Sequence, residues 1–326
     1  MRYLHVSEKH GVHTATLRET APPVLRSGEV PVHVAASGLN RADLSQIAGR
    51  YPPPAGESEL LGLEVSGIVD ATGEQVCALL AGGGHAEQAA VPVGQIFPVP
   101  TGMDLITAAG IPEAFLTAFA TLVVAAGLKT GDTVLVHAGA SGVGLAAIQL
   151  AKLLHARVAA TTRTRAKLAV LTAAGADLAI LSEGRGREVG VAAELEQLWG
   201  SDPVDIILDP VGSAMLDLNL RALAVGGRVI IISTLSGSKG ELDLALLMSK
   251  RARLIGSTLR SRPREEKARL VARFREELLP AFAAGKLRVI VDAVYPLERA
   301  AEAFQRMREN RNVGKLLLDW GSTVKS

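Results

Sequence analysis

The pattern of apolar and polar positions divides the chain into two kinds of region. From about residue 131, short apolar runs of strand length alternate with stretches whose apolar residues recur at helical spacing. The strand-like runs lie at 134–137, 157–162, 176–181, 204–208, 228–232 and 253–257. Strands that alternate with helices in this way predict a parallel, doubly wound sheet with right-handed crossovers.

The region before residue 112 does not show that alternation. Short β-type runs such as 30–36 and 64–69 are separated by turns rich in glycine and proline. This punctuation predicts a mainly β module of partly open, barrel-like character. From Asp104 to Leu128 the pattern becomes helical, with interruptions at Gly110 and Pro112, and leads into the alternating region.

The last part of the chain is expected to rejoin the first. Residues 263–284 predict one long helix, and residues 289–318 predict a strand, a helix (297–309) and a final strand (315–318). The fold class is therefore α/β, a mainly β domain with an inserted parallel-sheet domain. The expected boundaries are 1–113 for the first part of the β domain, 114–256 for the insertion and 257–326 for the return.

The clearest motif in the chain spans residues 134–162. It has the order of strand, glycine-rich turn, helix and second strand that is typical of dinucleotide-binding βαβ units. We expect Gly139 to permit the tight turn and Gly144 to let the helix pack closely. Ser141 stands where the fingerprint usually has its second glycine, and its hydroxyl is a donor. A pyrophosphate would lie at the positive end of the helix.

The end of the second strand indicates which dinucleotide binds. An NAD site places a carboxylate about 20 residues after the glycine turn, but none occurs between Lys152 and Asp177. Thr162, Arg163 and Lys167 stand there instead. Hydroxyls and cations suit a 2′-phosphate, so the sequence favours NADPH. The alternative interpretation is a solvated basic start of a helix.

Ligands of doubly wound sheets lie at the carboxyl ends of the strands. We therefore expect the cofactor contacts to come from the turns that follow the strands. The predicted cofactor residues are Gly139, Ser141, Gly142, Val143, Gly144, Thr162, Arg163, Lys167, Asp209, Val211, Ser233 and Leu259.

Composition and charge narrow the class of protein. A chain of 326 residues with 48% hydrophobic and 21% charged residues fits a globular protein of two domains. A net charge of +2 does not indicate a nucleic-acid or membrane partner. One cysteine, Cys77, excludes an internal disulfide and a multi-cysteine zinc site. The longest apolar stretch, 114–128, is too short to span a bilayer. A cytoplasmic enzyme is the expected class.

Several motifs together resemble one family. They are Gly38–Leu44, Tyr51–Pro54, Leu61–Gly67, Ala78–Gly84, Ile111–Ala114, His137–Gly144 and Ser257–Arg262. With them the chain resembles the zinc-independent medium-chain dehydrogenases/reductases, namely the zeta-crystallin-like quinone oxidoreductases, and most of all their tumour-suppressor-inducible branch. The resemblance implies a GroES-like β domain at both chain ends, an inserted Rossmann domain and a homodimer.

The resemblance also bears on metal binding and on the reaction. In the family's zinc alcohol dehydrogenases, a cysteine and a histidine stand at the positions of Asn40 and Leu63. Asparagine and leucine cannot replace them at a catalytic zinc, so we expect no metal. Quinone reduction by NADPH is then the leading hypothesis. Reduction of activated alkenes, as in enoyl reductases, stays open, and so does an NADPH-bound structural or RNA-binding protein. The small charge and the lack of interleaved aromatic and basic residues argue against RNA.

The resemblance implies roles for individual residues. Asn40 would orient the nicotinamide, Tyr51 would lie at the mouth of the substrate cleft and Ser141 would contact the cofactor; these three are the candidate catalytic residues. Tyr51 could also be a turn tyrosine beside a proline run. Lys315 would reach the phosphates from the last strand.

The sequence departs from the family in two places. Residues 69–76 are shorter than usual, and a tyrosine that some relatives use beside the 2′-phosphate is missing around 179–182. The other polar candidates favour structural roles. We expect His137 to be a packed histidine, Asp43 and Glu64 to form a salt bridge or cap, and Cys77 to be a buried small hydrophobe.

Overall fold

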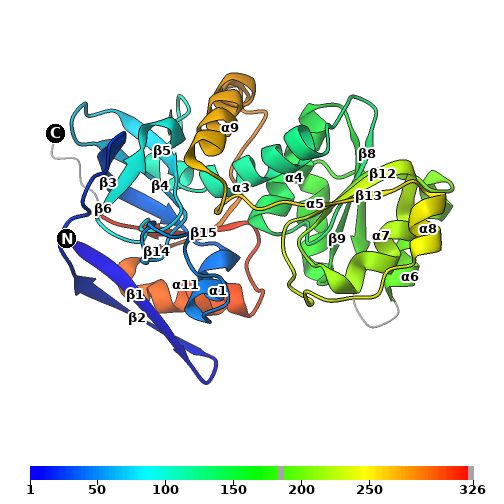
Figure 1. Ribbon diagram of the computed structural model, residues 1–326, viewed down its shortest axis with the longest axis horizontal. Helices are drawn as coiled ribbons and strands as arrows, with labels where there is room; N and C mark the ends of the chain where they lie inside the picture. Colours follow the sequence, from blue (N-terminus) through cyan, green and yellow to red (C-terminus); the bar gives the residue numbers. More distant parts are fainter. Residues whose placement is uncertain (183–186, 322–326) are drawn as a thin grey trace. The chain divides into compact units, whose positions relative to one another are not determined.

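The computed structural model describes residues 1–182 and 187–321 (Figure 1). Two compact units share the chain. Unit 1 contains Met1–Leu116 and the C-terminal part from Leu259, and unit 2 contains Thr117–Thr258. The α/β fold class predicted from the sequence is confirmed, because unit 1 is built on a largely antiparallel sheet and unit 2 on a parallel one.

Unit 2 contains a six-stranded parallel sheet in the order β10-β9-β8-β11-β12-β13. Its strands are β8 (Thr133–Val136), β9 (Arg157–Thr162), β10 (Leu178–Leu181), β11 (Val204–Asp209), β12 (Leu223–Ile231) and β13 (Arg253–Gly256). The order reverses beside β8, the first strand of the unit. Carboxyl ends at such a switch point form the usual ligand edge of doubly wound folds.

Helices precede the first of these strands and connect the others. They are the π-helix η2 (Phe119–Ala125), α4 (Gly142–Leu153), η3 (Arg165–Lys167), α5 (Leu168–Ala173), α6 (Arg187–Trp199), η4 (Ser213–Met215), α7 (Leu216–Ala222) and α8 (Leu244–Ser249). Helix α4 packs on η2 and on β8, whereas α6 packs on α7. Figure 1 shows α6, α7 and α8 gathered beside one another. Leu195 and Leu218 of α6 and α7 close a core with Leu135, Ile207 and Val229 of the sheet.

Unit 1 contains a seven-stranded sheet in the order β14-β15-β3-β4-β5-β7, with β6 paired to β3. A separate hairpin of β1 (Arg2–Lys9) and β2 (Val12–Glu19) precedes it. The strands of the large sheet are β3 (Glu29–Gly38), β4 (Glu64–Val69), β5 (Gln75–Leu79), β6 (Gln88–Pro92), β7 (Ile96–Pro98), β14 (Val291–Pro296) and β15 (Lys315–Asp319). Because β15 pairs with β3, the C-terminal segment rejoins the sheet of the N-terminal segment.

The helices of unit 1 are short except for one. They are α1 (Arg41–Ile47), η1 (Val93–Gln95), α2 (Leu105–Ala108), α3 (Pro112–Ala118, which runs across the boundary between the units), α9 (Arg264–Glu277), α10 (Leu279–Ala283), η5 (Leu297–Arg299) and α11 (Ala300–Arg308). The prediction of one continuous helix over 263–284 was wrong. Helix α9 ends at Glu277 because Pro280 has no N–H to extend it, and a proline fits only the first turn of the new helix α10.

One strand of unit 2 is longer than the sequence predicts. We expected β12 to begin at Arg228, after two glycines, but it begins at Leu223. Val204 of β11 is paired with Leu223 and Ile206 with Arg228, so the register shifts between them. The glycines therefore lie in an irregularity inside the strand, which the apolar pattern does not reveal.

Candidate functional site

The glycine turn of unit 2 leads from β8 into α4. Ser141 is the N-cap residue of α4, and its Oγ accepts a hydrogen bond of 3.0 Å from the N–H of Gly144. The serine oxygen is therefore used in the cap, while its hydroxyl hydrogen stays available to a ligand. This position matches the predicted role of Ser141 as a donor beside the cofactor, which stays a prediction.

The tight turn itself depends on a different residue from the one expected. The left-handed backbone angle belongs to Ala138, with φ 49°, and not to Gly139. Gly139 is needed for space, since a Cβ there would lie 3.0 Å from side-chain atoms of Ala160 and Leu171. A Cβ on Gly144 would lie 2.6 Å from two carbonyl oxygens of the turn. At Gly144 the close approach is between the helix and the turn, whereas the prediction was an approach to the sheet. At Gly139 the backbone needs space and not a left-handed angle.

The start of α4 has the features that an anionic group requires. The N–H groups of Gly142 and Val143 have no protein acceptor among the described residues, as is usual for the first positions of a helix. Helix α4 is 12 residues long, and its N-terminus carries the positive end of the helix dipole. The start of α4, which we call the cradle, therefore fits the pyrophosphate of a dinucleotide.

The three residues predicted to recognise a 2′-phosphate differ in exposure. Arg163 is exposed directly after β9, whereas Thr162 is buried. The Oγ1 of Thr162 accepts a hydrogen bond of 3.3 Å from the N–H of Thr164. Lys167 ends η3 and is only 8% exposed. Of the three, Arg163 offers its cationic group to solvent at the carboxyl end of the strand.

Asp209 lies at the end of β11 and is fully buried. Its Oδ1 accepts hydrogen bonds from the N–H groups of Val211 (2.6 Å) and Gly212 (3.0 Å), and its Oδ2 accepts one from the side-chain amide of Asn219 (2.9 Å). Direct contact of this carboxylate with a cofactor does not fit that burial. Asp209 holds the turn in which the half-buried Val211 lies; Ser233, also half-buried, follows β12 at the same edge.

In unit 1 the structure brings together Asn40 and Lys315, which are 275 residues apart in the sequence. The side-chain amide of Asn40 donates to Glu64 Oε1 (2.9 Å), and its Oδ1 accepts from Lys315 Nζ (2.9 Å). The N–H of Asn40 also donates to Asp43 Oδ2 (2.7 Å) in the first turn of α1. Both faces of the Asn40 amide are therefore fixed by charged partners.

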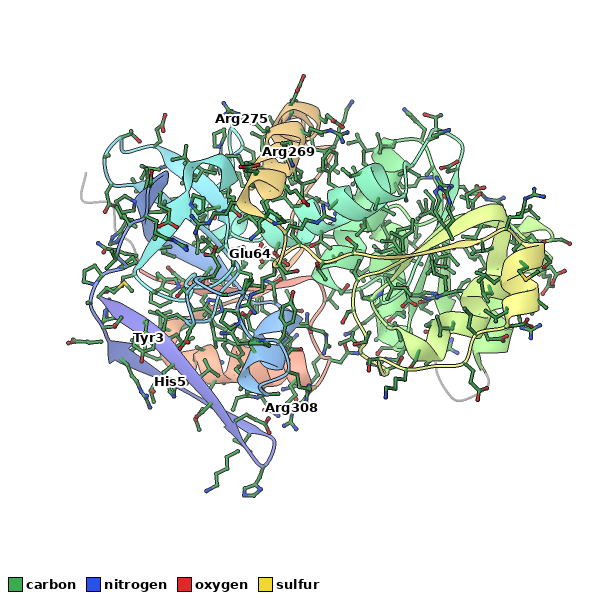
Figure 2. The ribbon with its side chains drawn as sticks, in the orientation of Figure 1. Tyr3, His5, Glu64, Arg269, Arg275 and Arg308 are labelled. Atoms are coloured by element: carbon green, nitrogen blue, oxygen red, sulfur yellow. The ribbon has the colours of Figure 1, made fainter. Side chains whose placement is uncertain are left out.

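Lys315 is 4% exposed and forms an ion pair with Glu64, which is fully buried. Its Nζ also donates to the backbone oxygen of Leu39 (3.0 Å). Figure 2 labels Glu64 among the interior side chains of unit 1. The ammonium group of Lys315 therefore binds Glu64, Asn40 and a backbone oxygen. These contacts do not support the predicted contact of Lys315 with the cofactor phosphates. The structural roles expected for Asp43 and Glu64 are present: Asp43 caps α1, and Glu64 forms the salt bridge with Lys315.

Glu113, in the first turn of α3, is a residue that sequence reasoning passed over. Its N–H donates to Glu64 Oε2 (2.8 Å), while its own Oε2 is buried with no hydrogen-bond partner. Burial raises the pKa of Glu113 to about 8, and the neighbouring Glu64 charge adds to the rise. The carboxyl group of Glu113 is therefore protonated at neutral pH. Only its place in the Ile111–Ala114 motif could have drawn attention to it.

Tyr51 lies beside a buried arginine. The guanidinium of Arg260 lies 5.1 Å from the centroid of the Tyr51 ring, and its Nη1 donates to the Tyr51 carbonyl (3.0 Å). Arg260 is 3% exposed and also donates to Ala81 O and to Gln46. Burial raises the pKa of the Tyr51 hydroxyl, and the Glu113 charge contributes. Leu259, also predicted as a cofactor residue, is 7% exposed in the same unit.

Other candidates have the surroundings of structural residues. Cys77 is fully buried in β5, where burial raises the pKa of its thiol, so it is the small hydrophobe we expected. Within residues 1–182 and 187–321, no cluster of three or more His, Cys, Asp or Glu side chains is arranged to hold a metal ion. None of the helices described there is long and apolar enough to cross a membrane.

Comparisons with known proteins agree on the family. Residues 26–101 match the model of the alcohol dehydrogenase GroES-like domain, and residues 142–276 match the model of the zinc-binding dehydrogenase domain. A quinone oxidoreductase from Lama guanicoe is 30% identical over 98% of this chain and 97% of its own length.

Two solved structures give the same result for the fold. The quinone oxidoreductase from Thermus thermophilus, solved also with NADPH, has a TM-score of 0.81 at 30% identity, over 98% of this chain and 100% of that one. An NAD-dependent alcohol dehydrogenase has a TM-score of 0.83 at 30% identity, with the same coverage. The two neighbours differ in the cofactor that their descriptions name. The chain belongs to the medium-chain dehydrogenase/reductase family and is an oxidoreductase of the zeta-crystallin-like quinone oxidoreductase type.

Proposed function

We propose that this oxidoreductase transfers reducing equivalents from NADPH to a quinone without a metal ion. The observation that carries the proposal is the environment of Asn40. Its amide is held by Glu64 and Lys315 at the position where zinc enzymes of the family have a cysteine. An amide fixed in this way is a poor ligand for a catalytic zinc.

The proposed absence of a catalytic zinc restricts the chemistry. Alcohol oxidation needs a metal, or a comparable group, to stabilise an alkoxide. A quinone is already electrophilic, so the protein has only to bind and orient the two reactants and provide a few donors. When bound, the nicotinamide supplies the hydride. Unit 2 contributes the cradle at the start of α4, and we assign the orientation of the nicotinamide to Asn40 and the acceptor side to Tyr51.

The preference for NADPH is supported by the end of β9. Arg163 is exposed there, and no carboxylate occurs between Lys152 and Asp177 to accept hydrogen bonds from the ribose of NAD. A guanidinium group can form a bidentate contact with a phosphate. A homodimer, which rests on the family resemblance, and a cytoplasmic location, which rests on the composition of the chain, belong to the same proposal.

Initial rates with two acceptors test the reaction. With NADPH in the presence of a chelator, we expect turnover of an ortho-quinone well above the uncatalysed rate, and little turnover of a 2-enoyl thioester. Equal or faster reduction of the thioester would support the alkene reductase instead. A quinone rate no higher than the rate without enzyme, or loss of activity on chelation, would contradict the proposal.

A further inference from the structure

Four buried side chains form one chain of hydrogen bonds at the carboxyl edge of the unit 2 sheet. Thr161 Oγ1 lies 3.0 Å from His137 Nδ1, and His137 Nε2 lies 2.8 Å from Asn219 Oδ1. The amide of Asn219 then donates to Asp209 Oδ2 at 2.9 Å. None of the four residues is more than 2% exposed. The chain therefore joins the ends of β9, β8 and β11 through helix α7.

The donor and the acceptor of each of these hydrogen bonds can be assigned. The carboxylate of Asp209 only accepts, so the Asn219 amide directs its NH₂ group to Asp209 and its oxygen to His137. An amide oxygen also only accepts, so the proton of the imidazole lies on Nε2. Nδ1 then accepts from the hydroxyl of Thr161. Burial lowers the pKa of His137, which keeps the ring neutral. The sequence prediction that His137 is a packed histidine is confirmed, and its packing is polar.

Thr161 and Asp209 are the two ends of this series of hydrogen bonds, and their backbone groups hold the turns predicted to bind the cofactor. The carbonyl of Thr161 accepts from the N–H of Gly139 in the glycine turn (2.8 Å). The carbonyl of Asp209 accepts from Ile232 N–H, directly before Ser233 (2.9 Å). The carboxylate of Asp209 fixes the turn that contains Val211. A shift of either end would therefore move several predicted cofactor contacts together.

We propose that His137 and Asn219 are positioning residues that lock the turns after β8, β9, β11 and β12 into the arrangement that the dinucleotide binds. The inference rests on the proposed function, because it concerns the same cofactor edge. It goes further by assigning a role in cofactor affinity to two residues that do not touch the cofactor. Removing one of these side-chain hydrogen bonds should loosen the turns and so weaken binding of the dinucleotide, although no group that contacts the dinucleotide is removed.

A pair of substitutions at Thr161 tests this claim. Thr161→Val keeps the shape but removes the hydroxyl, which leaves His137 Nδ1 without a donor, whereas Thr161→Ser keeps the hydroxyl. We expect Thr161→Val to raise the Kd of NADPH about tenfold, as measured by the fluorescence of the bound cofactor, with kcat at saturating NADPH within about twofold of the wild type. Thr161→Ser should restore the wild-type Kd.

A matched control separates positioning from a general loss of stability. Leu195→Ala removes a fully buried side chain of α6 from the core of unit 2. It should shift the midpoint of urea denaturation to a lower concentration and leave the Kd of NADPH unchanged. If Thr161→Val raises the Kd no more than Leu195→Ala does, the inference is wrong.

A second variant covers the case in which Thr161→Val does not fold. Asn219→Leu removes the amide that links His137 to Asp209, and it should raise the Kd of NADPH in the same way at unchanged kcat. A wild-type Kd in this variant would overturn the inference. Wild-type binding is measured first with NADPH and with NADH. Equal affinity for both would defeat the proposed cofactor preference, and the variants would then be compared with NADH, so the two failures are distinguishable.

Discussion

The carboxyl edge of unit 2 and the buried cluster of unit 1 hold their predicted site residues by different means. In unit 2 the turns are held by backbone groups and by neutral side chains, and the carboxylate of Asp209 is surrounded by N–H donors. In unit 1, Asn40 is held by the ion pair of Lys315 and Glu64, and the N–H of Glu113 donates to the same Glu64 carboxylate. We call the unit 1 group of Asn40, Glu64, Glu113 and Lys315 the charged cluster.

The difference indicates which site should respond to pH. The unit 2 network contains one carboxylate, Asp209, which accepts only from N–H donors, and one imidazole, His137, whose pKa is lowered by burial, so its hydrogen bonds should persist at and above neutral pH. A buried ion pair with a third carboxyl group beside it depends on which carboxyl holds a proton. We therefore expect the geometry around Asn40 to vary with pH and the cofactor cradle to be nearly independent of it at and above neutral pH.

The largest effect is predicted for a substitution that breaks the charged cluster. Lys315→Met removes the cation and leaves Glu64 buried without its partner, which should lower the free energy of unfolding by about 3–5 kcal/mol. Urea denaturation measures the change. The double variant Lys315→Met with Glu64→Gln removes the stranded charge as well, and should recover a large part of the loss. A double variant as unstable as the single one would show that the ion pair is not the cause.

The next prediction concerns Glu113 and pH. Its pKa is about 8 in the folded protein and near 4.5 when exposed, so the folded state binds a proton that the unfolded state releases between these values. The stability that the bound proton contributes is complete below pH 4.5 and is lost as the pH rises to 8. Between these values the folding constant falls by up to about tenfold for each pH unit. Relative to the wild type, Glu113→Gln should become more stable with rising pH. Urea denaturation of both proteins from about pH 5 to 8 measures this, and a constant difference would contradict it.

A smaller effect is expected from crowding the unit 2 cradle. In Gly144→Ala the new Cβ would lie 2.6 Å from two carbonyl oxygens, so the start of α4 must shift. We expect a loss of about 1–3 kcal/mol in unfolding free energy, and at least a tenfold rise in the Kd of NADPH by fluorescence titration. Gly190→Ala in α6 is the control, because its Cβ would meet no atom within 4 Å. An unchanged Kd in Gly144→Ala would show that the cradle does not bind the dinucleotide.

The smallest effect is predicted at the exposed end of β9. Arg163→Ala removes one charge-assisted contact, so the Kd of NADPH should rise about tenfold while that of NADH stays the same. Isothermal titration with both cofactors measures the ratio. Arg165→Ala, at a second exposed arginine two residues on, is the comparison variant and should change neither Kd. Equal changes for NADPH and NADH in Arg163→Ala would exclude a contact to the 2′-phosphate.

The fold of unit 2 was predictable because its signals are local. The β8–α4–β9 segment follows from apolar runs, a glycine turn and helical spacing within about 30 residues, and the observed β9 has the predicted bounds. The errors have local causes too. Pro280 divides the predicted long helix, and the glycine irregularity conceals the start of β12.

The sites were predictable only in part. The turn residues follow from the motif, but the contacts that hold them join residues far apart in the sequence. Lys315 and Glu64 are 251 residues apart, and His137 and Asn219 are 82 apart. No periodicity encodes such pairs. The left-handed backbone of Ala138 was missed because the glycine beside it is the usual residue for that conformation.

The measurement that tests the central claim most directly is the cofactor preference in quinone reduction. The ratio kcat/KM for NADPH over that for NADH is determined with one ortho-quinone at saturating concentration, in the presence of a chelator. The account predicts a ratio of at least ten, with rates unchanged by the chelator. A ratio near one, or a rate that disappears on chelation, would contradict it.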